Sequence, residues 1–143
     1  MRISKIRELE FSCKDISVEV ENIEFGKNLF FALSFAYTPD LEKKVFALKT
    51  FVKYTLKDQQ EPVLTFTNEI IFDVIGIDEV VKIKKDSKEY EINNNFLVPL
   101  VSVAIGTTRG MLAAKTTGKR ISEFPIPMLN PQEVLKKMGA KQV

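Results

Sequence analysis

Apolar and polar residues alternate along two neighbouring segments of the chain, residues 29–38 and 44–57. In the second segment the even-numbered residues are mostly apolar, whereas the odd-numbered face includes Lys49 and Lys53. Because successive side chains of a strand point to opposite sides of a sheet, this period predicts two strands, with the even-numbered face of 44–57 buried. Thr38-Pro39-Asp40 supplies turn residues, so we expect a hairpin that turns there.

Two further strands are predicted on either side of this hairpin. Residues 63–75 place apolar side chains at alternate positions, interrupted by Asn68, and residues 9–13 alternate before the hairpin. The segment 14–28 is too long for a tight turn and too apolar for a solvated loop, so we expect it to cross the sheet and pack against it. Residues 80–92 are Lys-rich, and their pattern leaves a short strand pair and a solvated loop both open.

One long helix and one short helix are predicted in the last third of the chain. Asn93-Asn94-Asn95 supplies candidate N-caps for a helix from Phe96 to about Thr116. Asn130 and Pro131 then open a helix that ends near Met138. The predicted fold is therefore α+β in one domain, 1–143: a four-stranded antiparallel sheet with a long crossover after the first strand, then the long helix and the short C-terminal helix.

The long helix is apolar around most of its circumference. A helix that covers one sheet needs an apolar stripe of roughly 100°, and here the polar positions form only a narrow stripe. The surplus apolar face predicts a homo-oligomer, a dimer or a tetramer. Gly106 and Gly110 share one face, where two backbones could approach closely; packing against the chain's own sheet is the alternative. The predicted oligomer interface comprises Val103, Gly106, Gly110, Met111 and Ala114.

The composition removes most catalytic chemistry. The chain has no His, which excludes His-based triads, His general bases and imidazole zinc sites. Cys13 lies in a strand pattern without a His partner, so a buried apolar role explains it better than a nucleophilic one. Thr117-Gly118-Lys119-Arg120 resembles the end of a phosphate loop, but Ala113 and Arg120 stand where that motif needs Gly and Ser or Thr. We therefore predict a protein that is not an enzyme, with no catalytic residues, no metal site and no cofactor.

The N-terminal residues lack the apolar run of a signal peptide, and no segment approaches the about 20 apolar residues that cross a bilayer. We therefore expect a cytoplasmic protein without membrane insertion. Lys49, Phe51 and Lys53 share one strand face, which forms an alternative platform for single-stranded nucleic acid or for an adaptor-type partner. An ordinary solvated face explains the same three residues, and nucleic acid is not the expected partner.

The order of these elements and three stretches of sequence resemble the SecB export-chaperone family. NFLVPLVSVAI from Asn95 is similar to the family's entry into its long helix. EFPIPMLNPQEVL from Glu123 is similar to its proline-rich link into the last helix, and FDVIGI from Phe72 is similar to the segment before the long helix. The order of elements matches over nearly the whole chain.

The resemblance implies a homotetramer, a dimer of dimers, that holds unfolded polypeptides without ATP. The apolar grooves of the chaperone that hold these polypeptides would lie between the crossover, the sheet and the C-terminal helix. Typical members dock on SecA through an acidic sheet surface, whereas this chain places Lys49, Lys53 and Lys57 there. That departure argues against SecA docking, so other clients, such as an antitoxin of a toxin–antitoxin system, or another binding role, fit better; protein export and an antitoxin-type client both stay open.

The crossover and the C-terminal part supply more apolar side chains than their lengths usually need. Core packing explains each of these residues taken singly. Methionine is unbranched and polarizable, so Met128 and Met138 suit a surface that accepts many sequences. The predicted polypeptide-binding residues are Ile16, Val18, Val20, Ile23, Phe25, Ile126, Met128, Leu129, Leu135 and Met138.

Overall fold

The computed structural model describes residues 1–86, 89–138 and 141–142. Its long strands are β1 (Arg2–Cys13), β2 (Leu29–Asp40), β3 (Val45–Leu56) and β4 (Leu64–Asp73), with β7 (Lys141–Gln142) beside β2. The strand order is β1-β4-β3-β2-β7; the four long strands are antiparallel, and β7 pairs parallel with β2. The fold is α+β with the four-stranded antiparallel sheet that the alternation predicts, and β7 is an addition.

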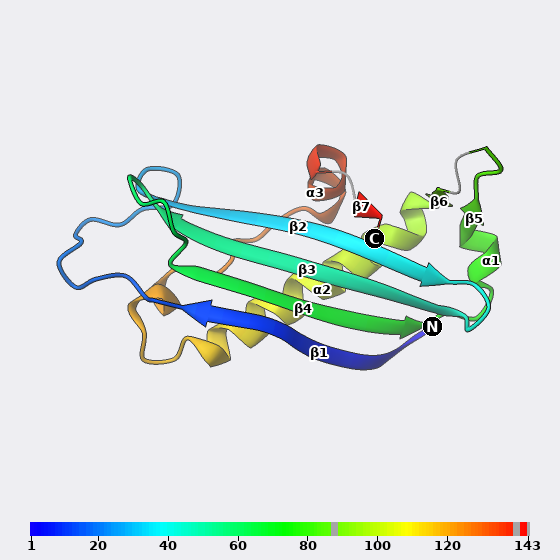
Figure 1. Cartoon of the computed structure of the whole chain (residues 1–143), viewed down its shortest axis with the longest axis horizontal. Helices are drawn as coiled ribbons and strands as arrows, with labels where there is room; N and C mark the ends of the chain where they lie inside the picture. The colour runs from blue at the N-terminus through cyan, green and yellow to red at the C-terminus, as the bar shows by residue number, and fades with distance from the viewer. Residues whose placement is uncertain (87–88, 139–140, 143) are drawn as a thin grey trace.

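The long helix α2 (Asn94–Lys115) runs across one face of the sheet (Figure 1). Beyond one end of the sheet lie α1 (Ile77–Val80) and a hairpin of β5 (Val81–Ile83) and β6 (Tyr90–Ile92). Segment 14–28 lies beyond the other end, and after α2 the chain continues through η1 (Arg120–Glu123) to α3 (Pro131–Met138). Both predicted helices are therefore present, and residues 80–92 contain a strand pair.

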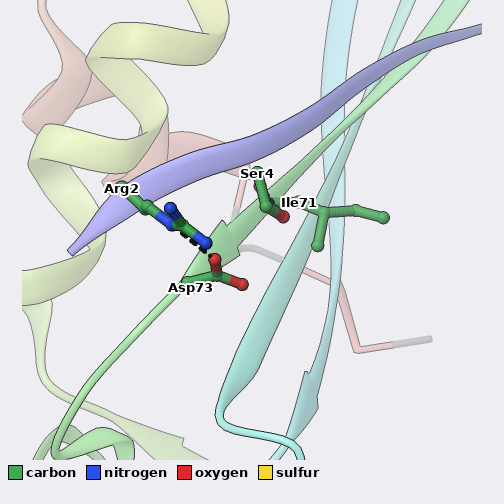
Figure 2. Close-up of polar contacts among 4 residues, drawn as sticks. All are labelled: Arg2, Ser4, Ile71 and Asp73. Carbon is green, nitrogen blue, oxygen red and sulfur yellow. Dashed lines mark hydrogen bonds and ion pairs between the residues drawn. The ribbon is translucent and has the colours of Figure 1, made fainter.

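β1 forms one edge of the sheet and pairs with β4, so segment 14–28 carries the chain from β1 to β2 on the far side of β3. Two register irregularities interrupt the β1–β4 pairing, between Ile3 and Lys5 and between Glu8 and Glu10. At the first, Ser4 Oγ donates to Ile71 O at 3.1 Å, and Arg2 Nε lies 2.8 Å from Asp73 Oδ2 (Figure 2). The second irregularity leaves Leu9 45% exposed, so its predicted alternation with Phe11 is wrong.

The core lies between α2 and the sheet. As predicted, the even-numbered face of β3 is buried; opposite it, α2 buries seven residues from Leu97 to Leu112. A polar contact crosses this interface, because Asn68 Nδ2 of β4 donates to Thr108 Oγ1 of α2 at 2.8 Å, with both side chains buried. Asn68, which interrupts the apolar pattern, thus helps to set how α2 lies on the sheet.

The hairpin turns later than predicted, at residues 41–44. Pro39 stays within β2, is buried, and pairs with Phe46. β7 pairs with β2 at Ala36 and Tyr37, so among the described residues Pro39 lies on an open edge of the sheet, which tolerates a residue that has no N–H to donate. Asp40 Oδ1 accepts from Lys43 N at 3.0 Å, and Lys44 adopts a φ of 57° to close the turn. Asp40 therefore begins the turn, and Pro39 does not take part in it.

By length and composition α2 is able to cross a membrane, so the expectation that no segment approaches this size is wrong. Its Gly, Ser and Thr residues interrupt every continuous apolar run without adding charge, so a search for unbroken apolar runs does not detect it. Seven residues of α2 are buried, and its other residues are partly or fully exposed.

Candidate polypeptide-binding site

Asp15 fixes the crossover segment 14–28 to the chain beyond α2. Its carboxylate accepts the backbone amides of Arg120 and Ile121, each at 2.9 Å. Arg120 Nη1 in turn donates to Ser17 O at 2.5 Å. Asp15 adopts a φ of 62°, a backbone conformation that Asp tolerates better than most residues. The start of the crossover is therefore held on η1 by hydrogen bonds from both segments.

The same contacts set the charge state of Asp15. Burial by itself raises the pKa of this carboxyl, but the amides of Arg120, Ile16 and Ile121 and the charge of Lys119 outweigh burial. The net effect holds the pKa below its ordinary value of 3.8. The carboxylate is thus charged at neutral pH, the form that accepts these hydrogen bonds.

Four aromatic rings, which we call the aromatic cluster, meet where the crossover, the sheet and the link to α3 converge: Phe25, Phe31, Tyr54 and Phe124. The centroid of the Phe25 ring lies 5.6 Å from that of Phe31, 5.7 Å from Tyr54 and 5.8 Å from Phe124, in edge-to-face geometry. The three Phe side chains are half-buried, whereas Tyr54 is buried. The cluster therefore offers a firm apolar wall that is partly open to solvent.

Two side chains hold the link between η1 and α3 on the molecule. Tyr54 Oη donates to Phe124 O at 2.7 Å. Arg109 of α2 donates from Nε to Ile126 O and from Nη2 to Pro127 O, both at 2.8 Å. Burial raises the pKa of Tyr54 to about 12, and the nearby charge of Arg109 opposes that rise. Arg109, one of the polar residues of α2, thus holds the link against the helix.

The predicted polypeptide-binding residues whose side chains are described fall into three groups. Val18 and Met128 are each 88% exposed, so both side chains are free to contact a partner. Ile16 and Ile126 are buried and belong to the core instead. The side chain of Met138 lies outside the described part of the chain. The remaining residues are half-buried against the core: Val20, Ile23, Phe25, Leu129 and Leu135.

Hollows lie between α2 and the C-terminal part, and two of them border residues of the predicted set that are not buried. A groove of about 280 Å³ is lined by Gly106 and Arg109 of α2 and by Met128 and Leu129 of the link. A second hollow, of about 430 Å³, lies between the start of α2 and α3, where Leu135 forms part of the wall. Met128, Leu129 and Leu135 of the predicted set therefore border depressions of the surface.

Four of the five predicted interface residues share the exposed side of α2: Val103, Gly106, Gly110 and Ala114. Met111 differs, because it is half-buried and its Sδ lies 3.7 Å from Asn68 Nδ2. Gly106 also borders the 280 Å³ groove, so the predicted client surface and the predicted oligomer surface touch at this residue.

Sequence reasoning missed Phe31, Phe124 and the two anchoring residues Asp15 and Arg109. Phe124 stands in the Phe-Pro pair that carries the family resemblance, so it could have been included. The contacts of Asp15 lie 105 and 106 residues away along the chain, and no local pattern signals them.

The sequence matches no protein-family model and no curated protein. Among solved structures, the chain is similar to the SecB-like chaperone Rv1957 of Mycobacterium tuberculosis, in complex with a ChAD peptide from the Rv1956 HigA1 antitoxin. The TM-score is 0.48, the sequence identity is 14%, and the alignment covers 90% of each chain. Because this likeness is distant, the geometry of the chain itself has to support any function.

Proposed function

We propose that this protein binds unfolded polypeptides in an extended form and holds them without ATP. The observation that carries the proposal is the exposure of Val18 and Met128, 88% each, on two segments that the aromatic cluster and Asp15 tie together. Exposed large apolar side chains beside half-buried apolar walls are typical of surfaces that bind other chains. The bound state would be stabilised mainly by burial of apolar area, which needs no nucleotide.

The shape of the surface suits a client of variable sequence. A Met side chain adapts to many partners, and Met128 stands over the 280 Å³ groove, whose other wall is the exposed side of α2. Val18 projects from the crossover beside Ser17, which is anchored through Arg120. We further propose that the clients are cytoplasmic, and that antitoxin-type polypeptides suit the surface better than exported ones. Lys49 and Lys53 lie on the sheet face for which the resemblance to the SecB family implies an acidic docking surface.

The proposal is tested by dilution of a guanidinium-unfolded protein into buffer without nucleotide, with aggregation followed by light scattering. We expect the wild type to suppress aggregation, and the double variant Val18→Ser, Met128→Ser to require several-fold more protein for equal protection. The matched control is Ile75→Ser, Ile83→Ser, because these residues are 89% and 55% exposed at the other end of the sheet.

Absence of protection by the wild type would contradict the proposed function. Equal loss of protection in both double variants would show that general surface hydrophobicity, and not this site, holds the client. Circular dichroism and the oligomeric state of each variant establish that the comparison concerns folded protein in the same assembly.

A further inference from the structure

The face of the sheet that points away from α2, which we call the outer face, has no described helix on it (Figure 1). In β2 and β3 this face carries Phe30, Ala32, Ser34, Lys49, Phe51 and Lys53. It lies on the opposite side of the sheet from Tyr54 and the aromatic cluster, because odd- and even-numbered residues of β3 point in opposite directions. The outer face is therefore a separate surface from the one proposed above to bind polypeptides.

Small side chains flank Phe51 and Lys53 of β3 on both sides, whereas Lys49 stands between Ala36 of β2 and Glu69 of β4. Phe51 pairs with Ser34 of β2 and with Thr67 of β4, and Lys53 stands between Ala32 and Thr65 in the same way. Phe51 is 38% exposed, and Phe30 is 42% exposed at the neighbouring strand. The two rings therefore present surface that neighbouring side chains of the sheet do not cover.

Two carboxylates of this face are paired with arginines, and a third, Glu10 of β1, accepts from Thr65 Oγ1 at 3.5 Å. Arg7 pairs with Glu69, which is 6% exposed, and Arg2 pairs with Asp73. Among the described residues, Lys49 and Lys53 take part in no ion pair. The outer-face positions of β2 from 30 to 38 and of β3 from 47 to 55 include no carboxylate. These positions of β2 and β3 therefore contribute two lysines and no carboxylate beside exposed rings, while Glu69 of β4, which pairs with Lys49 in the register, is already engaged by Arg7.

We propose that the outer face binds single-stranded nucleic acid, with a base stacked on Phe51 and phosphates beside Lys49 and Lys53. Alternate residues of a strand stand about 7 Å apart, so Lys49, Phe51 and Lys53 present charge, ring and charge along one line. A single strand offers a π-face and a phosphate at every nucleotide, which matches this alternation for any sequence. An acidic polypeptide would complement the lysines but has no aromatic base at each step to stack on Phe51.

The experiment measures fluorescence anisotropy of labelled 15-residue oligo(dT) and oligo(rU) between 50 and 300 mM NaCl. Phe51→Ala should weaken binding roughly 5- to 150-fold, which corresponds to about 1–3 kcal/mol for one stacked base. Lys49→Gln, Lys53→Gln should flatten the slope of log K against log salt by about 1.4, since each phosphate contact to a single strand contributes about 0.7. The matched control is Lys82→Gln, Lys84→Gln, because both lysines are exposed on or beside β5.

Three results would overturn the proposal. The first is no salt-dependent binding by the wild type at 50 mM NaCl. The second is an equal change of the salt slope in the outer-face variant and in the Lys82→Gln, Lys84→Gln control. That result would indicate that the oligonucleotide is attracted by the charge of the whole protein. The third is equal binding of poly-glutamate together with unchanged affinity of Phe51→Ala, which would indicate a site for acidic polypeptides. If Phe51→Ala fails to fold, Phe51→Trp replaces it and should retain or strengthen binding.

Discussion

At the scale of single residues, Tyr54 connects three parts of the chain. It belongs to β3, its ring meets Phe25 of the crossover, and its hydroxyl donates to Phe124 O of the link. Loss of this hydroxyl would leave a carbonyl of the link without its partner, which typically costs about 1 kcal/mol of stability or more. The residue therefore ties the binding surface to the core.

The raised pKa of Tyr54 gives a pH dependence with a definite sign. Folding favours the neutral phenol, because the pKa is about 12 in the folded state against 10.0 ordinarily. The stabilisation is therefore complete below pH 10 and is lost as the pH rises toward 12. We expect Tyr54→Phe to be less stable than the wild type at pH 8, and the difference to shrink above pH 10.

Guanidinium unfolding followed by circular dichroism between pH 8 and pH 11.5 measures this difference. Tyr90→Phe, on β6, is the matched control, because it also removes a tyrosine hydroxyl but lies outside the link. A gap between wild type and Tyr54→Phe that stays constant over the whole range would contradict the assigned role of the hydroxyl.

Residues within one strand were predictable, whereas their distant partners were not. Alternation alone identifies the buried face of β3, including Phe46, Leu48 and Tyr54, because a strand repeats every two residues. The same pattern marks Asn68 as an exception but says nothing of Thr108, which reaches it only when α2 packs on β4. Polar partners of this kind depend on the tertiary arrangement.

At the scale of elements, the start of α2 is set by one of three consecutive asparagines. The sequence left all three open as caps, and the structure assigns the role to Asn93, whose Oδ1 accepts from Asn95 N at 2.8 Å. Asn94 already lies inside the helix and is exposed. The choice follows from backbone conformation, because Asn93 is extended with φ −66° and ψ 123°.

This assignment predicts different effects for two neighbouring substitutions. Asn93→Ala should lower the free energy of unfolding by about 0.5–2 kcal/mol, since an N-cap hydrogen bond is lost. Asn94→Ala is the matched control, and it should leave stability unchanged or raise it slightly because Ala favours the helix interior. Urea denaturation of both variants measures the difference, and equal destabilisation would rule out Asn93 as the cap.

Elements with strong periodicity were predicted well, and those set by local exceptions were not. Helix α3 begins at Pro131 as expected, with Asn130 Oδ1 accepting from Gln132 N at 3.0 Å. The turn after β2 was misplaced because Pro39 is favoured in turns yet is also tolerated in an edge strand. The β1 bulge at Leu9 breaks the alternation by one residue, which a fixed period of two cannot anticipate.

At the scale of the whole molecule, the exposed side of α2 remains the strongest indication of a second copy. Val103 is 39% exposed, and Gly106, Gly110 and Ala114 lie open beside it without a charged residue among them. A Cβ added at Gly106 or Gly110 would meet no atom within 4 Å, apart from the helix's own backbone. A side chain at either position therefore fits a single copy but would separate two closely packed helices.

We therefore expect light scattering at micromolar concentration to report a multiple of the 16.3 kDa chain mass. Gly110→Leu should shift the dissociation midpoint by roughly tenfold, or about 1.4 kcal/mol, because it blocks close approach of the helices. Arg109→Ala should shift the midpoint less, since Arg109 is engaged with Ile126 O and Pro127 O of its own chain. A wild type found only at 16.3 kDa would contradict the assembly. Equal shifts in the two variants would place the interface elsewhere, leaving the groove shared by Gly106 and Met128 wholly available to a client.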